Sequence, residues 1–277
     1  MRIDPLAGAL GAEIRGVDLT RLTDDGWREV HDAFLRYSVL AIRDQQLEPH
    51  DMMEIGARFG EPCPYPFVSG IDGFPFIFEV VKEESETVNF GGNWHSDTTY
   101  LPTPPLGTLL YAVETPSHGG DTLFASTAAA YEALSDGMKS LLNGPRGVNS
   151  AGLKHSGGRH QLHQTISSMR LHDIDSGARY EAEHPVVRTH PETKRKALYV
   201  SRSHTIRFRD MSEEESRPLV EYLQAHQTRP EFTCRVRWSP GTLTVWDNRC
   251  TQHNAINDYH GQRRRMRRLT VGPQTPQ

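Results

Sequence analysis

The fold is decided by three runs near the end of the chain: Phe-Thr-Cys-Arg-Val-Arg-Trp at 232–238, Leu-Thr-Val-Trp at 243–246 and Arg-Met-Arg-Arg-Leu-Thr-Val at 265–271. Each run has the composition of a β-strand. Working back toward the N-terminus, further apolar runs add four strand candidates, at 38–42, 74–81, 106–113 and 122–125. This density of strands predicts a β core.

Helical patterns lie mostly in the first half. Thr23 can cap a helix in which Trp27, Val30 and Phe34 share one face, and Pro49 opens a second helix. We also expect a helix over 126–142 and another after the capping box at Ser212. The pattern predicts a mainly β fold with flanking helices, built as a double-sheet barrel.

The 277 residues fit one domain, 1–277, and net charge −4 does not favour binding of nucleic acid. No stretch approaches the roughly 20 apolar residues of a membrane span, and residues 1–16 lack the apolar core of a signal peptide. We therefore expect a cytoplasmic protein that does not bind membranes. Residues 144–183 are polar and weakly periodic, which indicates a lid insertion or partial disorder. Three widely spaced cysteines suggest neither disulfides nor a zinc site.

Candidate metal ligands begin at Trp94-His95-Ser96-Asp97. On a strand, side chains two positions apart share a face, so His95 and Asp97 can offer an imidazole and a carboxylate to one metal. A surface histidine beside an aspartate that caps a helix would give the same sequence motif without binding a metal. A second histidine, His253, follows Trp246-Asp-Asn-Arg and can come from a neighbouring strand. Two histidines and one carboxylate form the facial triad of non-haem Fe(II) oxygenases, which leaves positions open for a co-substrate and O2.

A basic run, 263–268, leads into the last strand candidate. Alternation places Arg264, Met266 and Arg268 on one face of that strand. If this face points inward, both guanidinium groups need anions, because an unpaired buried charge costs several kcal/mol. A carboxylate ligand suits the planar fork of arginine, although the protein's own Asp or Glu residues would also serve.

Taken together, the chain resembles the TauD/TfdA family of Fe(II)- and 2-oxoglutarate-dependent dioxygenases over nearly its whole length. The motifs that carry the resemblance lie at 11–19, 39–44, 59–61, 94–97, 104–105, 119–123, 184–190, 197–200, 246–249 and 264–268. The resemblance implies a double-stranded β-helix, the jelly roll of cupin-like proteins. It also implies a homodimer or homotetramer.

Residue by residue, the resemblance identifies His95, Asp97 and His253 as ligands of Fe(II). Thr122 and Arg264 match the residues that hold the distal carboxylate of 2-oxoglutarate. Arg268 matches an arginine that binds either the substrate or the co-substrate. Tyr65 stands where the family's taurine enzyme has a sulfonate-contacting histidine, which does not favour taurine itself. With Arg268, three residues are expected in the substrate pocket: Tyr65, Phe90 and Asn93.

The expected activity is oxidation of a C–H bond in a small anionic substrate, with Fe(II), 2-oxoglutarate and O2. Cleavage of a C–O or C–S bond follows if the hydroxyl lands beside a heteroatom. The candidate substrates are sulfonates, sulfate esters, aryloxyalkanoates and natural-product intermediates. The alternative is a non-catalytic barrel that binds iron or a keto acid as a sensor or scaffold. A zinc hydrolase would not need the Thr122 and Arg264 pair.

Overall fold

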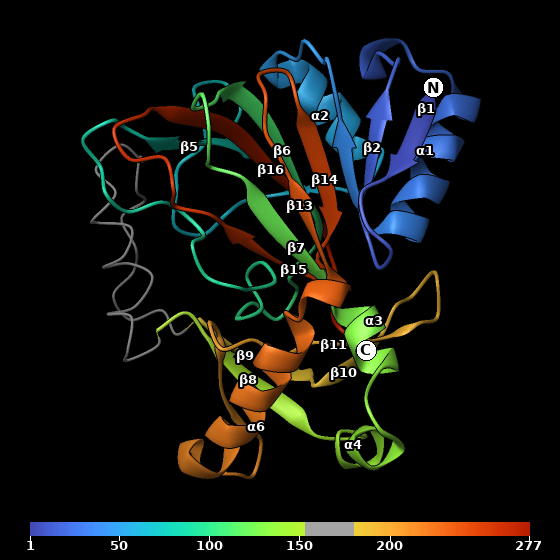
Figure 1. The fold of residues 1–277 in the computed structure, drawn as a ribbon, viewed down its shortest axis with the longest axis vertical. Coiled ribbons are helices and arrows are strands. Elements are labelled where there is room, and N and C mark those ends of the chain that lie inside the picture. Colours follow the sequence, from blue (N-terminus) through green and yellow to red (C-terminus); the bar gives the residue numbers. More distant parts are fainter. Residues whose placement is uncertain (153–179) are drawn as a thin grey trace.

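The computed structural model describes residues 1–152 and 180–277 and shows a mainly β protein with helices around it (Figure 1). The largest sheet has eight strands. Seven of them follow the order β1-β2-β3-β14-β6-β16-β4, and the eighth, β5, pairs antiparallel with β16. Its strands are β1 (Arg2–Pro5), β2 (Ala12–Arg15), β3 (Val39–Ile42), β4 (Pro62–Cys63), β5 (Ile77–Lys82), β6 (Pro105–Glu114), β14 (Leu243–Asp247) and β16 (Arg264–Pro273).

A second sheet of three strands, in the order β13-β7-β15, faces the large sheet. Its strands are β7 (Thr122–Ser126), β13 (Thr233–Val236) and β15 (Thr251–Ala255). Buried side chains from both sheets form one core cluster, which includes Leu110, Trp246 and Met266 from the large sheet and Phe124 and Val236 from the small one. Apolar area removed from water between the two sheets is the main force that holds them together.

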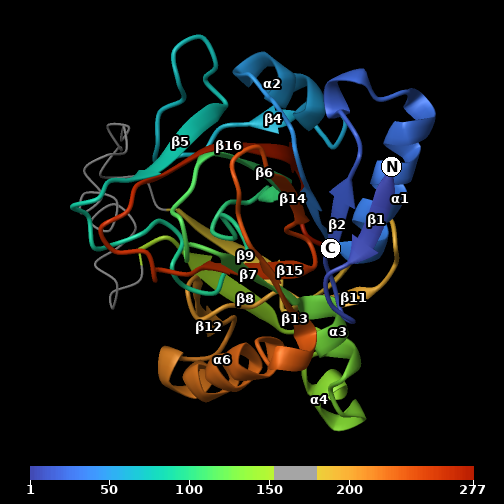
Figure 2. The same ribbon diagram turned by 45° about the horizontal axis from the view of Figure 1, so that its top comes forward.

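Helices cover the outer face of the large sheet. The helix α1 (Asp24–Tyr37) is capped by Thr23, whose hydroxyl accepts from the Gly26 amide as predicted, and α2 (Pro49–Ala57) begins at Pro49. Val30, Phe34 and Met52 pack on Leu40 and Leu243 of the sheet. Figure 2 shows α1 and α2 on this side and α6 (Glu213–Gln227) at the opposite end.

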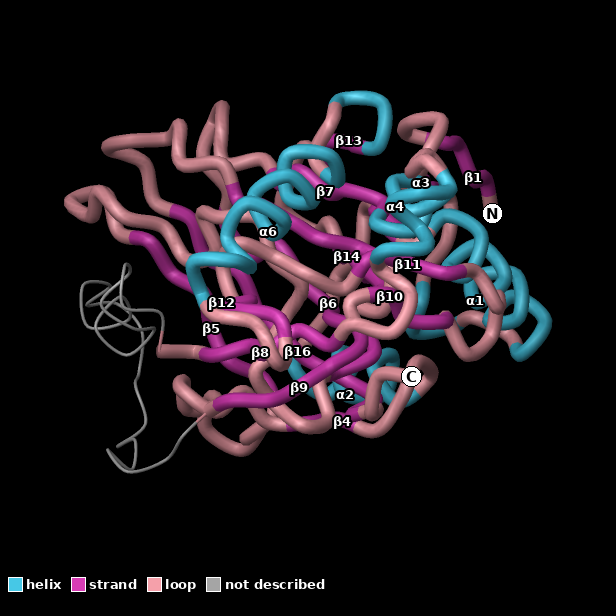
Figure 3. The backbone as a smooth tube through the Cα atoms, turned by 90° about the horizontal axis from the view of Figure 1, so that it is seen from below, coloured by secondary structure: helices cyan, strands magenta, loops and turns pink. Residues whose placement is uncertain are grey.

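The part around α6 contains smaller sheets, which are seen from below in Figure 3. Its strands are β8 (Arg146–Ser150), β9 (Glu181–Pro185), β10 (Val187–Thr189), β11 (Lys196–Leu198) and β12 (Thr205–Phe208). Two short 3-10 helices, Leu19–Arg21 and Pro230–Phe232, complete the described elements. Within the described residues, no helix is both long and apolar enough to cross a membrane.

One prediction from the sequence was wrong in detail. The helix expected over 126–142 is two helices, α3 (Thr127–Glu132) and α4 (Asp136–Leu141), because Ser135 caps a new helix by accepting from the Met138 amide. The weakly periodic segment 144–183 contains the strands β8 and β9 at its ends, paired with each other. The remainder of the predicted lid, 153–179, lies outside the described residues.

Candidate functional site

Three buried side chains converge on one point of the interior. Asp97 Oδ1 lies 3.6 Å from His95 Nε2 and 3.7 Å from His253 Nε2. One ligand atom from each residue lies within 4.8 Å of the others. Metal–ligand bonds of about 2.1 Å place neighbouring ligand atoms about 3 to 3.5 Å apart, so this spacing needs only small shifts to hold one ion. The structure therefore brings together the three residues predicted as ligands.

Main-chain hydrogen bonds set the positions of the two histidines. The His95 amide donates to the His253 carbonyl (3.1 Å), and the His253 amide donates back to the His95 carbonyl (2.8 Å). The Ser96 hydroxyl adds a bond to the Thr251 carbonyl (2.7 Å). His253 belongs to β15, but His95 makes only an isolated β-bridge. The strand expected over 95–97 is thus absent from this described segment, and a turn begins at Asp97, followed by Thr98 at φ 44°.

Further contacts orient the ligand atoms. His95 Nδ1 lies 2.6 Å from the Asn93 carbonyl oxygen. Because a carbonyl only accepts, Nδ1 carries the proton and Nε2 presents its lone pair to the site, which is the usual arrangement of a metal-binding histidine. The Thr108 hydroxyl donates to Asp97 Oδ2 (2.8 Å), while Oδ1 faces the two imidazoles. Thr108, on β6, was not predicted, since a buried threonine in a strand carries no distinctive sequence signal.

The guanidinium of Arg268 stands beside this site. Its Nη2 is 2.5 Å from Asp97 Oδ1, and the side chain is 4% exposed. Burial would raise the pKa of Asp97, but Arg268, with the two imidazoles, holds that pKa well below its ordinary value. Four aromatic rings lie 5.7–5.9 Å from the guanidinium carbon: Tyr65, Phe78, Phe90 and Trp246. This cation is therefore held in an apolar wall next to the candidate metal ligands.

Arg264 faces the same interior, as the alternation predicted. It is 5% exposed, and its Nε and Nη2 have no hydrogen-bond partner among the residues that the structure describes. Its guanidinium carbon lies 5.5 Å from the Trp238 ring, and Trp238 Nε1 donates to the Thr122 hydroxyl (3.0 Å). Burial lowers the pKa of Arg264. Trp238, which the sequence placed only at a strand end, thus links the two residues predicted to hold a carboxylate.

The other predicted pocket residues divide into two groups. Tyr65 is buried, stacks on Phe78 at 5.1 Å and meets Phe90 edge-on at 6.0 Å. Asn93 has an exposed side chain and reaches the site through its carbonyl group. Asn93 stays a predicted pocket residue, and the structure adds an orienting contact of its main chain with His95.

His204 is a buried residue of this region that the sequence reasoning missed. Its ring lies 5.7 Å from the His95 ring and 5.2 Å from the Tyr100 ring. Its Nδ1 is 2.9 Å from the Thr99 hydroxyl oxygen. It occurs in the polar run Ser-Arg-Ser-His-Thr (201–205), where nothing in the pattern distinguishes a buried histidine from a loop residue.

A second set of potential metal ligands, His190, Asp247 and Cys250, is already engaged in the protein's own contacts. His190 Nε2 lies 2.9 Å from Asp247 Oδ2, and Arg249 donates to both oxygens of that carboxylate (2.8 and 2.7 Å). Cys250 Sγ lies 3.4 Å from the Ser38 hydroxyl oxygen. A carboxylate occupied on both oxygens by a guanidinium does not suit a cation, so this cluster is structural.

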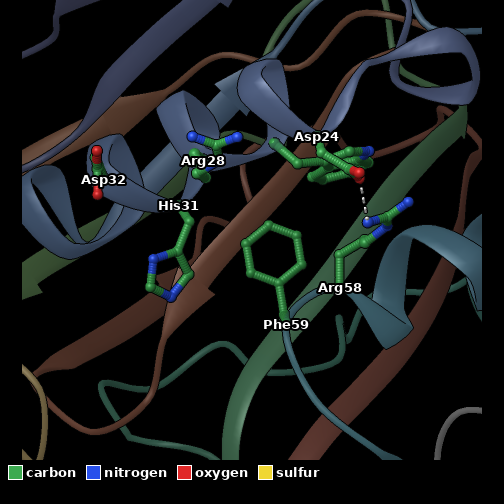
Figure 4. Close-up of a pocket in the computed structure, with 7 residues that line it drawn as sticks. Asp24, Arg28, His31, Asp32, Arg58 and Phe59 are labelled. Carbon is green, nitrogen blue, oxygen red and sulfur yellow. Dashed lines mark hydrogen bonds and ion pairs between the residues drawn. The ribbon is translucent and has the colours of Figure 1, made fainter.

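A surface pocket lies between α1 and the chain that follows α2 (Figure 4). Arg58 forms an ion pair with Asp24 (3.2 Å), and Trp27 packs edge-on against Phe59. Asp24 and Arg58 are exposed, so solvent screens their charges. The pocket contains none of the converging ligands, and it sits on helices that cover the outer face of the large sheet.

A buried pair of histidines with one carboxylate is the ligand set typical of a mononuclear non-haem iron oxygenase. The chain belongs to the taurine catabolism dioxygenase TauD, TfdA family, whose model matches residues 2–270. As a member of this family it is a 2-oxoglutarate-dependent dioxygenase that uses Fe(II) and O2.

Two curated relatives and one solved structure agree with this assignment. An alkylsulfatase of Acinetobacter baylyi is 36% identical, covering 98% of this chain and 84% of the relative. An alpha-ketoglutarate-dependent sulfate ester dioxygenase of Pseudomonas putida is 34% identical, covering 99% and 90%. The crystal structure of AAD-2 with Mn(II) and N-oxalylglycine has a TM-score of 0.80 and 31% identity, covering 99% of this chain and 98% of that one.

Proposed function

We propose that the chain oxidises a small organic anion and that His95, Asp97 and His253 are its three protein ligands for Fe(II). The observation that carries this proposal is the 3.6–3.7 Å convergence of both imidazoles on one carboxylate oxygen. The donor set fits the ion, because two neutral imidazoles and one carboxylate on one side leave the opposite positions open. Bound iron, with 2-oxoglutarate and O2, would supply the oxidising power for attack on a C–H bond.

Thr122 and Arg264 would hold the distal carboxylate of 2-oxoglutarate. Within the described part of the chain, Nε and Nη2 of the buried Arg264 have no hydrogen-bond partner, and a carboxylate is the ligand that its planar fork matches. Trp238 orients the Thr122 hydroxyl by donating to its oxygen, so the hydroxyl proton remains available for a second acceptor. These residues would set how far the keto acid reaches toward the metal ligands.

Arg268 would bind the anionic group of the substrate, with Tyr65 and Phe90 against its apolar part. The aromatic wall excludes water, and a guanidinium in such surroundings attracts an anion more strongly than in solvent. Both curated relatives are named for sulfate esters or alkyl sulfates, so we propose an alkyl sulfate ester. Hydroxylation of the carbon bonded to the ester oxygen would give a product that breaks down to an aldehyde and hydrogen sulfate.

Four broader features belong to the same proposal. The two facing sheets would form a double-stranded β-helix, and residues 1–277 would form one domain. The protein would be a cytoplasmic homodimer or homotetramer. Light scattering on a sizing column would measure the number of subunits. A monomer at micromolar concentration would contradict the proposed homodimer or homotetramer.

The test is anaerobic titration of the protein with Fe(II) and then 2-oxoglutarate. We expect the weak visible charge-transfer band of a chelated keto acid in the wild type and its loss in His95→Ala. His118→Ala is the matched control, because His118 is exposed. The absence of the band in the wild type, or an undiminished band in His95→Ala, would contradict the ligand assignment. Succinate release with a series of alkyl sulfates would then define the substrate.

A further inference from the structure

Lys82, the last residue of β5, is a buried cation that the proposed function does not yet use. Its side chain is 2% exposed, and Nζ has no hydrogen-bond partner in the described ranges 1–152 and 180–277. Nζ lies over the Tyr259 ring, 4.5 Å from its centroid. An ammonium group carries three donors, and the face of a ring satisfies none of them as a hydrogen-bond acceptor would.

The strand register places Lys82 beside Arg264. The strands β5 and β16 run antiparallel, and Lys82 is the partner of Arg264, as Phe78 is of Arg268. Cross-strand partners project on the same face of a sheet, so Lys82 shares the interior face with both arginines. Two like charges directly opposite each other destabilise a sheet. This position would therefore be unfavourable unless something negative lies between the two cations.

Among the described residues, the acids near these two cations are paired with other arginines. Glu83 pairs with Arg263 at 2.9 Å, and Glu79 pairs with Arg265 on the outward face of β16. Asp121, which acts on Arg264 electrostatically, is engaged by Arg235 at 2.5 Å. In the described part of the chain, neither Lys82 nor Arg264 has a carboxylate within ion-pair distance. Burial of an unpaired charge costs several kcal/mol, so the two cations call for an external anion.

Tyr259 shows that the two cations approach the same place. Its ring centroid lies 4.5 Å from the ammonium nitrogen of Lys82, and its hydroxyl acts electrostatically on the charge of Arg264. A Cβ added to Gly120 would come within 3.2 Å of the same ring, so Tyr259 also packs on the turn that leads into Thr122. Lys82, Arg264 and Thr122 are thus arranged around one aromatic ring.

We propose that Lys82 is a third anchor for the distal carboxylate of 2-oxoglutarate, together with Thr122 and Arg264. This inference rests on the proposed function, since it assigns a residue to the same co-substrate. A lysine and an arginine play different parts here: the guanidinium fork fixes the plane of the carboxylate, and the ammonium adds a compact charge that can approach from one side. The site would accordingly favour keto acids with a second carboxylate over keto acids without one.

The alternative is that Lys82 has only a structural role, as a cation packed on Tyr259. Both the structural role and the anchoring role predict that substitution of Lys82 lowers the stability of the protein. They differ in ligand selectivity, because a structural cation has no reason to distinguish between two keto acids of equal length. 2-Oxopentanoate has the same carbon chain as 2-oxoglutarate and lacks the distal carboxylate, which makes it the matched probe.

The experiment measures the Kd of both keto acids by calorimetry, with Mn(II) in place of Fe(II), in the wild type and in Lys82→Met. We expect the Kd of 2-oxoglutarate to rise at least tenfold and that of 2-oxopentanoate to change less than threefold. Arg264→Met should show the same selective loss, and Lys196→Met, which removes an exposed lysine on β11, should show no loss.

An unchanged ratio of the two Kd values in Lys82→Met would overturn the role of Lys82. Binding of 2-oxopentanoate by the variant shows that it is folded, and Lys82→Gln provides the same comparison should Lys82→Met fail to fold. Failure of the wild type to bind 2-oxoglutarate would instead contradict the proposed function. Selective loss in Arg264→Met alone would leave the co-substrate site in place and exclude Lys82 from it.

Discussion

Arg268 Nη2 lies 2.5 Å from Asp97 Oδ1, the same carboxylate oxygen that faces His95 Nε2 and His253 Nε2. One oxygen atom thus connects the candidate metal ligands to the candidate substrate anchor. The arginine balances the buried charge of Asp97, and its Nε, which has no hydrogen-bond partner among the described residues, remains available as a donor. A substrate anion that binds Arg268 would therefore be placed directly beside the ligand set.

Arg268→Met tests this placement. Charge-assisted hydrogen bonds contribute about 1.5–3 kcal/mol, so the Kd of hexyl sulfate should rise roughly ten- to hundredfold. Calorimetry with Mn(II) and N-oxalylglycine present would measure it. Arg265→Met is the control, because Arg265 pairs with Glu79 on the outer face. A rise in the Kd of 2-oxoglutarate, with hexyl sulfate binding unchanged, would show that Arg268 serves the co-substrate.

Asp97→Asn tests the metal site without changing side-chain size. A ligand that binds only the folded state stabilises it by about 2.7 kcal/mol at a hundred times its Kd, so Mn(II) should raise the Tm of the wild type by a few degrees. The variant should show no such rise, since an amide is a poorer ligand and Arg268 loses its partner. Asp32→Asn, an exposed change on α1, should respond like the wild type. An equal rise in Asp97→Asn would place the metal elsewhere.

Asp247→Asn tests the structural cluster through its pH dependence. Burial would raise the pKa of Asp247, but Arg249 and His190 hold it at about 2, below the ordinary 3.8. The carboxylate therefore stabilises the fold fully above about pH 4, and this contribution is lost as the pH falls toward 2. At pH 7 the variant should lose about 3–5 kcal/mol of unfolding free energy. Urea unfolding should show a smaller difference in unfolding free energy between the wild type and Asp247→Asn at pH 3 than at pH 7. An equal difference at both pH values would contradict the ion pairing of Asp247.

The three free thiols should react poorly in the native protein. Burial raises the pKa of Cys234 and of Cys250 to about 12, and burial also raises that of the half-buried Cys63. Since the thiolate is the reactive form, iodoacetamide at pH 8 should leave Cys234 and Cys250 unmodified for hours. Mass spectrometry before and after denaturation would measure this. Rapid native labelling of Cys250 would contradict the packing around it.

Local signals in the sequence predicted several elements well. The Thr23 cap of α1, the capping box at Ser212 and the proline that opens α2 each act within one turn of a helix, so a single sequence shows them. The alternation of the basic run correctly put Arg264 and Arg268 on the buried face of β16. The motif resemblance identified the TauD/TfdA family, which the family model confirmed over residues 2–270.

Features that depend on distant partners could not be predicted in the same way. The turn at Asp97 is held by Ser96 bonding to Thr251, and no local pattern reveals that contact. Lys82 looks like an ordinary strand-end lysine until its register with Arg264 is known. The division of 126–142 into two helices follows from Ser135, whose capping role competes with continuation of the first helix.

The two candidate histidine ligands are joined by reciprocal main-chain hydrogen bonds. The backbone around the centre is therefore supported independently of whether iron is loaded. A chelated protein should keep its overall shape, so a cell that runs short of iron would retain a reservoir of intact apoprotein. Activity could return on remetallation alone, without new synthesis or refolding.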